Sequence, residues 1–320
     1  MKLLFILMLL SGMTALAQQK PAMYYTDSGV IAKPIAKDPK VIYFKGRYLM
    51  YYSVPGHNNQ NWSIGIAASN DLTNWEKIGN IQPAADYEKN GLCAPGAIVK
   101  DGKVHLFYQT YGNGKNDAIC HAVSHDGISF TRNATNPIFR PTGNWTCGRA
   151  IDAEVVMFNN RYWLFFATRD TSYKIQMQGV AATSSLNTSF NRAEWTQLTD
   201  SSILHPSLPW EKQCIEGASC VQIGKELYMF YAGGYNNEPQ QIGIAKSKDG
   251  IHWERMSDMP FLSNGRAGSW NESESGHPDI FKANDGRYYL FFQGNNDKGR
   301  SWYLSKKEVK FDGKKWIVKN

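Results

Sequence analysis

The stretch DPKVIYFKGRYLMYY at residues 38–52 recurs four more times along the chain. Its counterparts are APGAIVKDGKVHLFY (94–108), DAEVVMFNNRYWLFF (152–166), EGASCVQIGKELYMFY (216–231) and HPDIFKANDGRYYLFF (277–292). Each copy places two apolar runs around a short segment with Gly or Asn, residue types that tolerate a positive φ in a tight β-hairpin turn. The copies recur at roughly 60 residues, and self-similarity at such a period is typical of a propeller or a solenoid.

The predicted hairpin turns are Lys45-Gly46, Asp101-Gly102, Asn159-Asn160, Ile223-Gly224 and Asp285-Gly286. After the hairpin, a third apolar stretch such as 63–68 or 241–245 leads to another turn. An outer strand is then expected to begin at Trp75, Phe130 or Trp253. Four short strands in each of five repeats predict an all-β chain, a five-bladed β-propeller with four-stranded antiparallel blades around a central axis.

Two repeats depart from this pattern. The third carries what looks like an insertion at residues 184–194, before Trp195. The fifth loses the pattern after Trp302, so we expect the N-terminal segment 24–35 to complete its sheet.

Residues 1–17 have the pattern of a cleaved secretory signal peptide. Met1-Lys2 is followed by an apolar run at 3–10 and by small residues that end in Ala15-Leu16-Ala17. This run is shorter than the roughly 20 residues that a membrane-spanning helix needs, and no second long run follows. We therefore expect residues 18–320 to form one catalytic propeller domain without a membrane span, secreted or periplasmic.

The charge pattern argues against a nucleic-acid partner. The formal net charge is +7, but the lysines and arginines are scattered and no basic cluster or aromatic-basic motif occurs. The five cysteines are an odd number, so at least one is free, and one pair could form a disulfide in an oxidising compartment. The spacing of the cysteines does not resemble that of a zinc site. We expect the protein to be a monomer.

Aligning the repeats by their turns places Asp38, Ala94, Asp152, Glu216 and His277 at one equivalent position, just before the first strand of each blade. In a propeller this strand lines the axis, so these side chains should converge. A single Asp there could simply cap a turn. Gathering several carboxylates costs free energy through repulsion and desolvation, and the set therefore indicates function.

Clustered carboxyl groups are best suited to cleaving a glycosidic bond, because one protonates the leaving oxygen while another handles water or acts as nucleophile. The acid must hold its proton near neutral pH, which burial and a neighbouring negative charge can arrange. No serine or cysteine nucleophile is better supported, since Cys214 has no evident base.

At these residues the chain resembles glycoside hydrolase family 43, the five-bladed propeller arabinofuranosidases, xylosidases and arabinanases. The resemblance implies an inverting single-displacement mechanism on plant-type polysaccharides or oligosaccharides. Asp38 would be the general base, Glu216 the general acid, and Asp152 the residue that orients the acid and raises its pKa. Cys93-Ala94-Pro95 resembles the family's Trp-Ala-Pro motif, with Cys in place of the aromatic residue.

The resemblance also suggests substrate contacts. His277 resembles the axial His that in many relatives lies near a bound calcium or water, so a structural calcium is conceivable there although no cofactor is expected to be required. Arg300 resembles a substrate-contacting Arg. Aromatic or polar contacts near the channel mouth are expected from Trp62, Trp145, Trp210, Trp270, Arg149 and His57.

Several alternatives remain open. Families 32 and 68 act on fructosides, usually with Asn before Asp-Pro and Cys after the acid, where this chain has Lys37 and Gly217. Family 117 uses His as its acid. A non-catalytic carbohydrate-binding propeller would repeat one site in every blade. The sugar is not fixed by the triad: α-L-arabinofuranoside is the first expectation, then β-xyloside, an exo-acting galactosidase substrate or β-fructoside.

Overall fold

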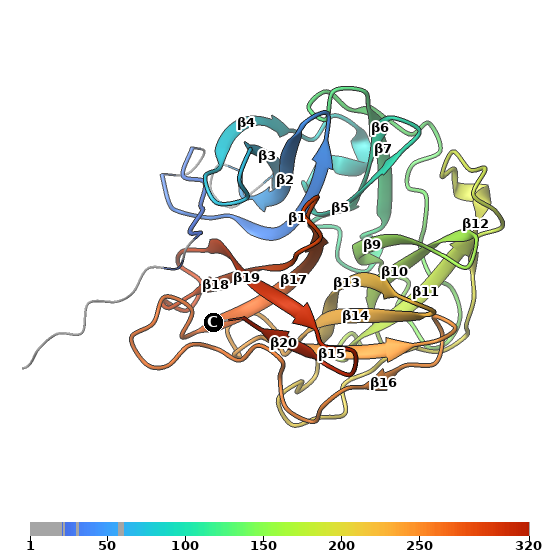
Figure 1. The fold of residues 1–320 in the computed structure, drawn as a ribbon. Helices are drawn as coiled ribbons and strands as arrows, with labels where there is room; N and C mark the ends of the chain where they lie inside the picture. The colour runs from blue at the N-terminus through green and yellow to red at the C-terminus, as the bar shows by residue number, and fades with distance from the viewer. Residues whose placement is uncertain (1–20, 22, 30–31, 57–60, 320) are drawn as a thin grey trace, which may run out of the picture.

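The computed structural model describes residues 21, 23–29, 32–56 and 61–319. Its strands form five four-stranded antiparallel sheets arranged around a common centre, which confirms the predicted five-bladed β-propeller (Figure 1). The expected signal peptide at 1–17 and His57 lie outside the described residues. None of the described residues forms a helix long and apolar enough to cross a membrane.

Each blade runs outward from its first strand, which lies nearest the centre. The first two blades are β1 (Lys37–Phe44), β2 (Arg47–Val54), β3 (Ser63–Ser69), β4 (Glu76–Ile81) and β5 (Leu92–Lys100), β6 (Lys103–Thr110), β7 (Ile119–Ser124), β8 (Thr131–Arg132). The third and fourth are β9 (Ile151–Phe158), β10 (Arg161–Arg169), β11 (Gln176–Thr183), β12 (Trp195–Gln197) and β13 (Ile215–Ile223), β14 (Glu226–Gly233), β15 (Gln241–Ser247), β16 (Glu254–Arg255). The fifth is β17 (Glu274–Lys282), β18 (Tyr288–Asn295), β19 (Tyr303–Phe311) and β20 (Trp316–Val318).

The first hairpin turns lie where the sequence predicted them. Asn159 and Asn160, for example, adopt φ values of 48° and 58°, a conformation that Asn tolerates better than most residues. In the fourth blade the prediction was wrong by one residue, because β13 continues through Ile223 and the turn is formed by Gly224 and Lys225.

The fifth blade takes its fourth strand from the C-terminal end of the chain, so the prediction that segment 24–35 would supply it was wrong. β20 pairs with β19 at positions 309–311. The described part of the N-terminal segment pairs with this region through isolated bridges, from Tyr25 to Leu304 and from Ile35 to Trp302. The predicted insertion in the third blade does separate β11 from β12, and it contains a 3-10 helix at Arg192–Glu194.

The five cysteines are all free thiols, so the disulfide considered from the sequence is absent from the structure. Cys93, Cys120, Cys214 and Cys220 are buried and Cys147 is partly exposed. The propeller is therefore held together by packing, hydrogen bonds and ion pairs.

Three blades share a buried arrangement that the sequence analysis missed. In each, a carboxylate accepts a hydrogen bond from a tyrosine on the second strand and forms an ion pair with a cation on the fourth strand. These partners satisfy a charge that would otherwise be costly to bury. The sets are Asp27–Tyr52–Lys77, Glu88–Tyr108–Arg132 and Glu211–Tyr231–Arg255. In the third blade Phe166 takes the place of the tyrosine and Trp145 lies near it. In the fifth blade the corresponding residues are Phe292 and Trp270.

Side chains also join neighbouring blades around the axis. The backbone N–H of Asp38 donates to Gln293 Oε1 at 2.9 Å, and that of Asp152 donates to Gln109 Oε1 at 2.9 Å. The N–H of Ala94 likewise donates to Ser53 Oγ at 2.7 Å. The second strand of one blade thus fixes the axial residue of the next, and the ring is closed between the fifth and first blades.

Candidate active site

Four axial residues share an unusual backbone. Asp38, Ala94, Asp152 and His277 have φ values of 53°, 48°, 53° and 43°, and each lies where the pairing of the first and second strands shifts register. Such a β-bulge bends the strand and re-aims its side chains. A left-handed backbone is strained for residues other than glycine, and at Asp38, Ala94 and Asp152 the hydrogen bonds from the preceding blades help to hold it.

Glu216 does not occupy the position that the repeat alignment assigned to it. In the fourth blade the left-handed residue is Gly217, with φ 58°, and the register shift lies between Glu216 and Ser219. Glu216 is therefore the counterpart of Lys37 and Cys93, one residue earlier than Asp38. The alignment of the repeats counted back from a turn at Ile223, but the turn of the fourth blade begins at Gly224. The residue assigned to the axial position was therefore also wrong by one.

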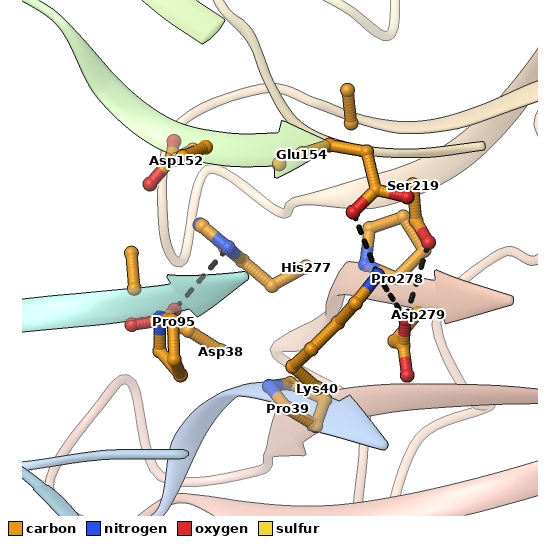
Figure 2. Close-up of a pocket in the computed structure, with 14 residues that line it drawn as sticks. Asp38, Pro39, Lys40, Pro95, Asp152, Glu154, Ser219, His277, Pro278 and Asp279 are labelled. Atoms are coloured by element: carbon orange, nitrogen blue, oxygen red, sulfur yellow. Dashed lines mark hydrogen bonds and ion pairs between the residues drawn. The ribbon is translucent and has the colours of Figure 1, made fainter. Parts of the chain in front are cut away.

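The side chains of the axial residues nevertheless converge. His277 lies between two carboxylates, with Nδ1 3.2 Å from Asp38 Oδ1 and Nε2 3.3 Å from Glu216 Oε1, and Figure 2 shows its ring pointing toward Asp38. Ligand atoms of Asp152, Glu216 and His277 all lie within 4.8 Å of one another. The three predicted catalytic carboxyl groups thus form one buried cluster around a single imidazole.

Two glutamines that the sequence analysis missed hold Glu216. Gln240 Nε2 donates to Glu216 Oε1 at 2.7 Å, and Gln176 Nε2 donates to Oε2. The amide oxygen of Gln176 accepts from Arg169 Nε at 3.0 Å, which orients its NH₂ group toward the carboxylate. Both glutamines stand at the start of a third strand in adjacent blades, so an alignment of third strands could have found them.

The electrostatics of the cluster give Asp152 and Glu216 very different pKa values. Burial, together with the charges of Glu216 and Asp38, raises the pKa of Asp152 to about 7 against the opposing effect of His277. Burial also acts to raise the pKa of Glu216, but the hydrogen bond and charge of His277, the Gln240 amide and the charge of Lys37 outweigh it and lower that pKa to about 2. Because the two carboxyls interact, a proton bound there belongs to the pair, and the opposite directions of the two pKa shifts favour Asp152 as its site.

The same field makes His277 a cation. Burial disfavours its charged form, but the charges of Asp38, Asp152 and Glu216 raise its pKa to about 10. A protonated imidazole has no lone pair for a metal, and both of its nitrogens already face carboxylates. Calcium also prefers six to eight oxygen ligands. With His277 protonated, a calcium ion on the axis would have to take its ligands from the carboxylates and from water.

The cluster forms the floor of a cavity of about 250 Å³. Of the predicted contacts, Trp62 and Arg149 line it, whereas Arg300 is exposed and bound through its backbone to Asp297. Trp145 donates to Thr142 O and packs beside Gly179 within its blade. Trp210 stacks on Tyr231 and Trp270 lies against Phe292. Further lining residues that were not singled out are Lys37, Cys93, Gln109, Tyr111, Arg169, Gln176 and Tyr235.

A second layer of charges lies on the axis beneath the cluster. Lys40 Nζ is 2.6 Å from Glu154 Oε2 and 3.1 Å from Asp279 Oδ1, and Figure 2 shows its side chain reaching between them. These residues follow Asp38, Asp152 and His277 by two positions. Their carboxylates also accept backbone N–H groups of adjacent blades, at Cys220 and Val41. A void of about 30 Å³ next to this layer has room for one or two waters.

Comparison with known proteins agrees with this architecture. Residues 30–316 match the model of glycosyl hydrolases family 43. The chain is similar to a thermostable family-43 glycoside hydrolase (TM-score 0.73, 20% identity, 92% of this chain and 96% of that one). It is also similar to an endo-1,4-beta-xylanase from Bacteroides thetaiotaomicron VPI-5482 (TM-score 0.71, 21% identity, 89% and 94%).

A shorter similarity extends to a characterised enzyme. Over 109 residues the chain is 32% identical to sucrose-6-phosphate hydrolase of Bacillus subtilis (strain 168), covering 31% of this chain. The match spans only 22% of that protein's length.

Proposed function

Since the chain belongs to glycosyl hydrolases family 43 and is a glycosidase, we propose that it removes α-L-arabinofuranosyl groups from plant-type glycans with inversion of configuration. The observation that carries the inverting mechanism is the placement of Asp38 and Glu216 on opposite sides of the His277 ring, whereas the choice of sugar follows the first expectation from the sequence. Inverting enzymes keep their two carboxyl groups roughly 6.5–9.5 Å apart, with space for water, and an interposed imidazole supports such a separation.

In the proposed reaction Asp38 is the base. A water on one face of the sugar attacks the anomeric carbon, and its proton passes to the Asp38 carboxylate as the new C–O bond forms. On the opposite face the bond to the leaving oxygen breaks, and that oxygen takes a proton from Glu216. One proton enters the site and one leaves it, so the cluster keeps its net charge during the chemical step.

Glu216 must carry a proton when the bond breaks, although its donors hold it ionised in the free site. Asp152 stores a proton within 4.8 Å, and a substrate hydroxyl that takes over Gln176 would relieve Glu216 of one donor. The proton then moves from Asp152 to Glu216. This step gives a role to the carboxylate of Asp152 and to the amide of Gln176, which both lie beside the proposed general acid.

The proposal is tested with nitrophenyl glycosides and variants of both carboxyls. We expect turnover of α-L-arabinofuranoside to exceed that of β-D-xyloside, β-D-galactoside and, for the fructosidase alternative, sucrose. Asp38→Asn and Glu216→Gln should each lower kcat by about 10² or more. Glu226→Gln, at the outer end of β14, is the matched control and should retain activity.

Proton NMR of the first product distinguishes the stereochemistry. Inversion yields the β-anomer of arabinose before mutarotation. Initial release of the α-anomer would contradict the mechanism, and a better turnover of another glycoside would replace the proposed sugar.

The sequence pattern of residues 1–17 supports export of the protein, which we also propose. Mass spectrometry of the protein purified from its native source should find a mature N-terminus near residue 18, and a retained Met1 would contradict this.

A further inference from the structure

The cavity has two chemically different sides. The carboxylates of the catalytic cluster occupy the axis, while Arg149, just before β9, and Arg169, at the end of β10, line the wall near the third and fourth blades. Both guanidinium groups meet at Gln176 Oε1, at 3.5 Å for Arg149 Nη1 and 3.0 Å for Arg169 Nε. Two cations are thus gathered beside a site built to bind a sugar.

These cations lack sufficient acceptors of their own. The side chain of Arg149 is only 12% exposed, and its ion pair from Nε to Asp117 Oδ2 is long at 3.4 Å. Within the part of the chain that the structure describes, no hydrogen bond or ion pair engages the two terminal nitrogens of Arg169. Arg149 Nε is buried without a hydrogen-bond partner, and the terminal nitrogens of the partly buried Arg169 face the cavity. Leaving a buried donor of a charged group unsatisfied is costly, so this wall favours an acceptor from outside the protein.

The Arg169 guanidinium is also held in place. It lies 4.5 Å from the ring centre of Tyr173 and 5.1 Å from that of Tyr235. Tyr235 is fixed by the hydrogen bond from its hydroxyl to Lys174 O, and Tyr173 adopts a positive φ of 65° in the loop between β10 and β11. A strained backbone at a bulky residue that presents its ring to an arginine indicates a selected geometry.

We propose that Arg149 and Arg169 form a subsite for the carboxylate of a uronic acid residue, so that the enzyme acts on acidic glycans. The planar guanidinium fork matches a carboxylate, and such charge-assisted bonds are stronger than neutral ones. The proposal rests on the proposed glycosidase function and specifies its substrate class.

The test measures binding of monosaccharides, which the enzyme cannot hydrolyse, and therefore does not depend on the proposed reaction. Isothermal titration calorimetry compares D-galacturonate and D-glucuronate with D-galactose and D-glucose, which carry a C6 alcohol in place of the carboxylate. We expect at least one uronate to bind about tenfold or more tightly than its neutral counterpart. This preference should weaken as sodium chloride is raised.

Arg169→Gln should abolish the preference. Arg161→Gln is the matched control, since Arg161 lies at the other end of β10 with its guanidinium 4.5 Å from the Trp163 ring centre. The proposal is overturned if the unaltered enzyme binds the acid and the neutral sugar equally, or binds neither. This outcome does not depend on whether the variants fold. A preference that survives in Arg169→Gln also overturns it, as does tighter binding of D-glucose 6-phosphate than of both uronates.

Discussion

Lys40 Nζ lies 2.6 Å from Glu154 Oε2, and the two residues follow Asp38 and Asp152 by two positions in their strands. The buried ion pair therefore connects the first and third blades directly beneath the carboxyls that we propose as catalytic. With Asp279 at 3.1 Å it also includes the fifth blade. Removal of the cation should affect both stability and the geometry of the site above.

We expect Lys40→Met to destabilise the protein by about 3–5 kcal/mol, because it leaves two buried carboxylates without their counter-ion. Urea unfolding monitored by tryptophan fluorescence measures the loss. Lys246→Met is the control, since the Lys246–Glu254 pair is 3.6 Å long with side chains 34% and 76% exposed. It should cost less than about 1 kcal/mol. Equal effects of the two substitutions would mean that the axial pair does not join the blades.

Gln176→Met should shift the pH dependence of kcat/KM to higher pH. Gln176 donates to Glu216, and a hydrogen bond to the ionised form lowers a carboxyl pKa. Without this donor the pKa of Glu216 rises, so the proton that Glu216 shares with Asp152 is kept to higher pH and the alkaline limb of the profile moves upward. The profile is measured with an aryl glycoside between pH 4 and 9.

Gln178→Met serves as the control for this shift. Gln178 is also a buried glutamine of β11, but it does not contact Glu216. A downward shift with Gln176→Met, or the same shift with both variants, would contradict the role of Gln176.

Chelation should leave the enzyme active. His277 is held as a cation between Asp38 and Glu216, and a protonated imidazole does not ligate a metal. After dialysis against EDTA we expect unchanged kcat and unchanged melting temperature, with elemental analysis as the check that metal was removed. A loss of activity that calcium restores would show that the cluster does hold an ion.

The repeats predicted the five blades because hairpin turns and apolar strands leave a periodic mark in the sequence. They did not predict the position of Glu216 within its blade. The turn at Gly224 begins one residue later than in the alignment, and the sequence of this blade still looks like a regular repeat because a β-bulge leaves no mark in it. Gln176 and Gln240 were missed because their role arises from the approach of adjacent blades. Trp145 was expected at the mouth of the central channel, yet it packs beside Gly179 within its blade. Its position depends on the course of the chain before β9, which the repeats do not predict.

A buried histidine pair between the second and third blades should make the protein sensitive to acid. His105 Nδ1 lies 3.0 Å from His121 Nε2, and Asn133 Nδ2 donates to His121 Nδ1 at 3.1 Å. This chain of bonds requires both rings to be neutral. Burial and the charge of Lys100 lower the pKa of His105 to about 4, and burial and His105 lower that of His121 to about 3.

Both pKa values lie below the ordinary value of about 6.5, so the unfolded chain binds protons before the folded one does. The stability that the pair contributes is complete above pH 6.5 and is lost as the pH falls toward 4 and 3. We expect the unfolding free energy to decrease between pH 7 and 4.5, and to decrease less steeply in His105→Phe/His121→Phe. The exposed His252 provides the control, because His252→Phe should keep the slope of the unaltered protein. An equal slope in all three proteins would assign the acid sensitivity to other groups.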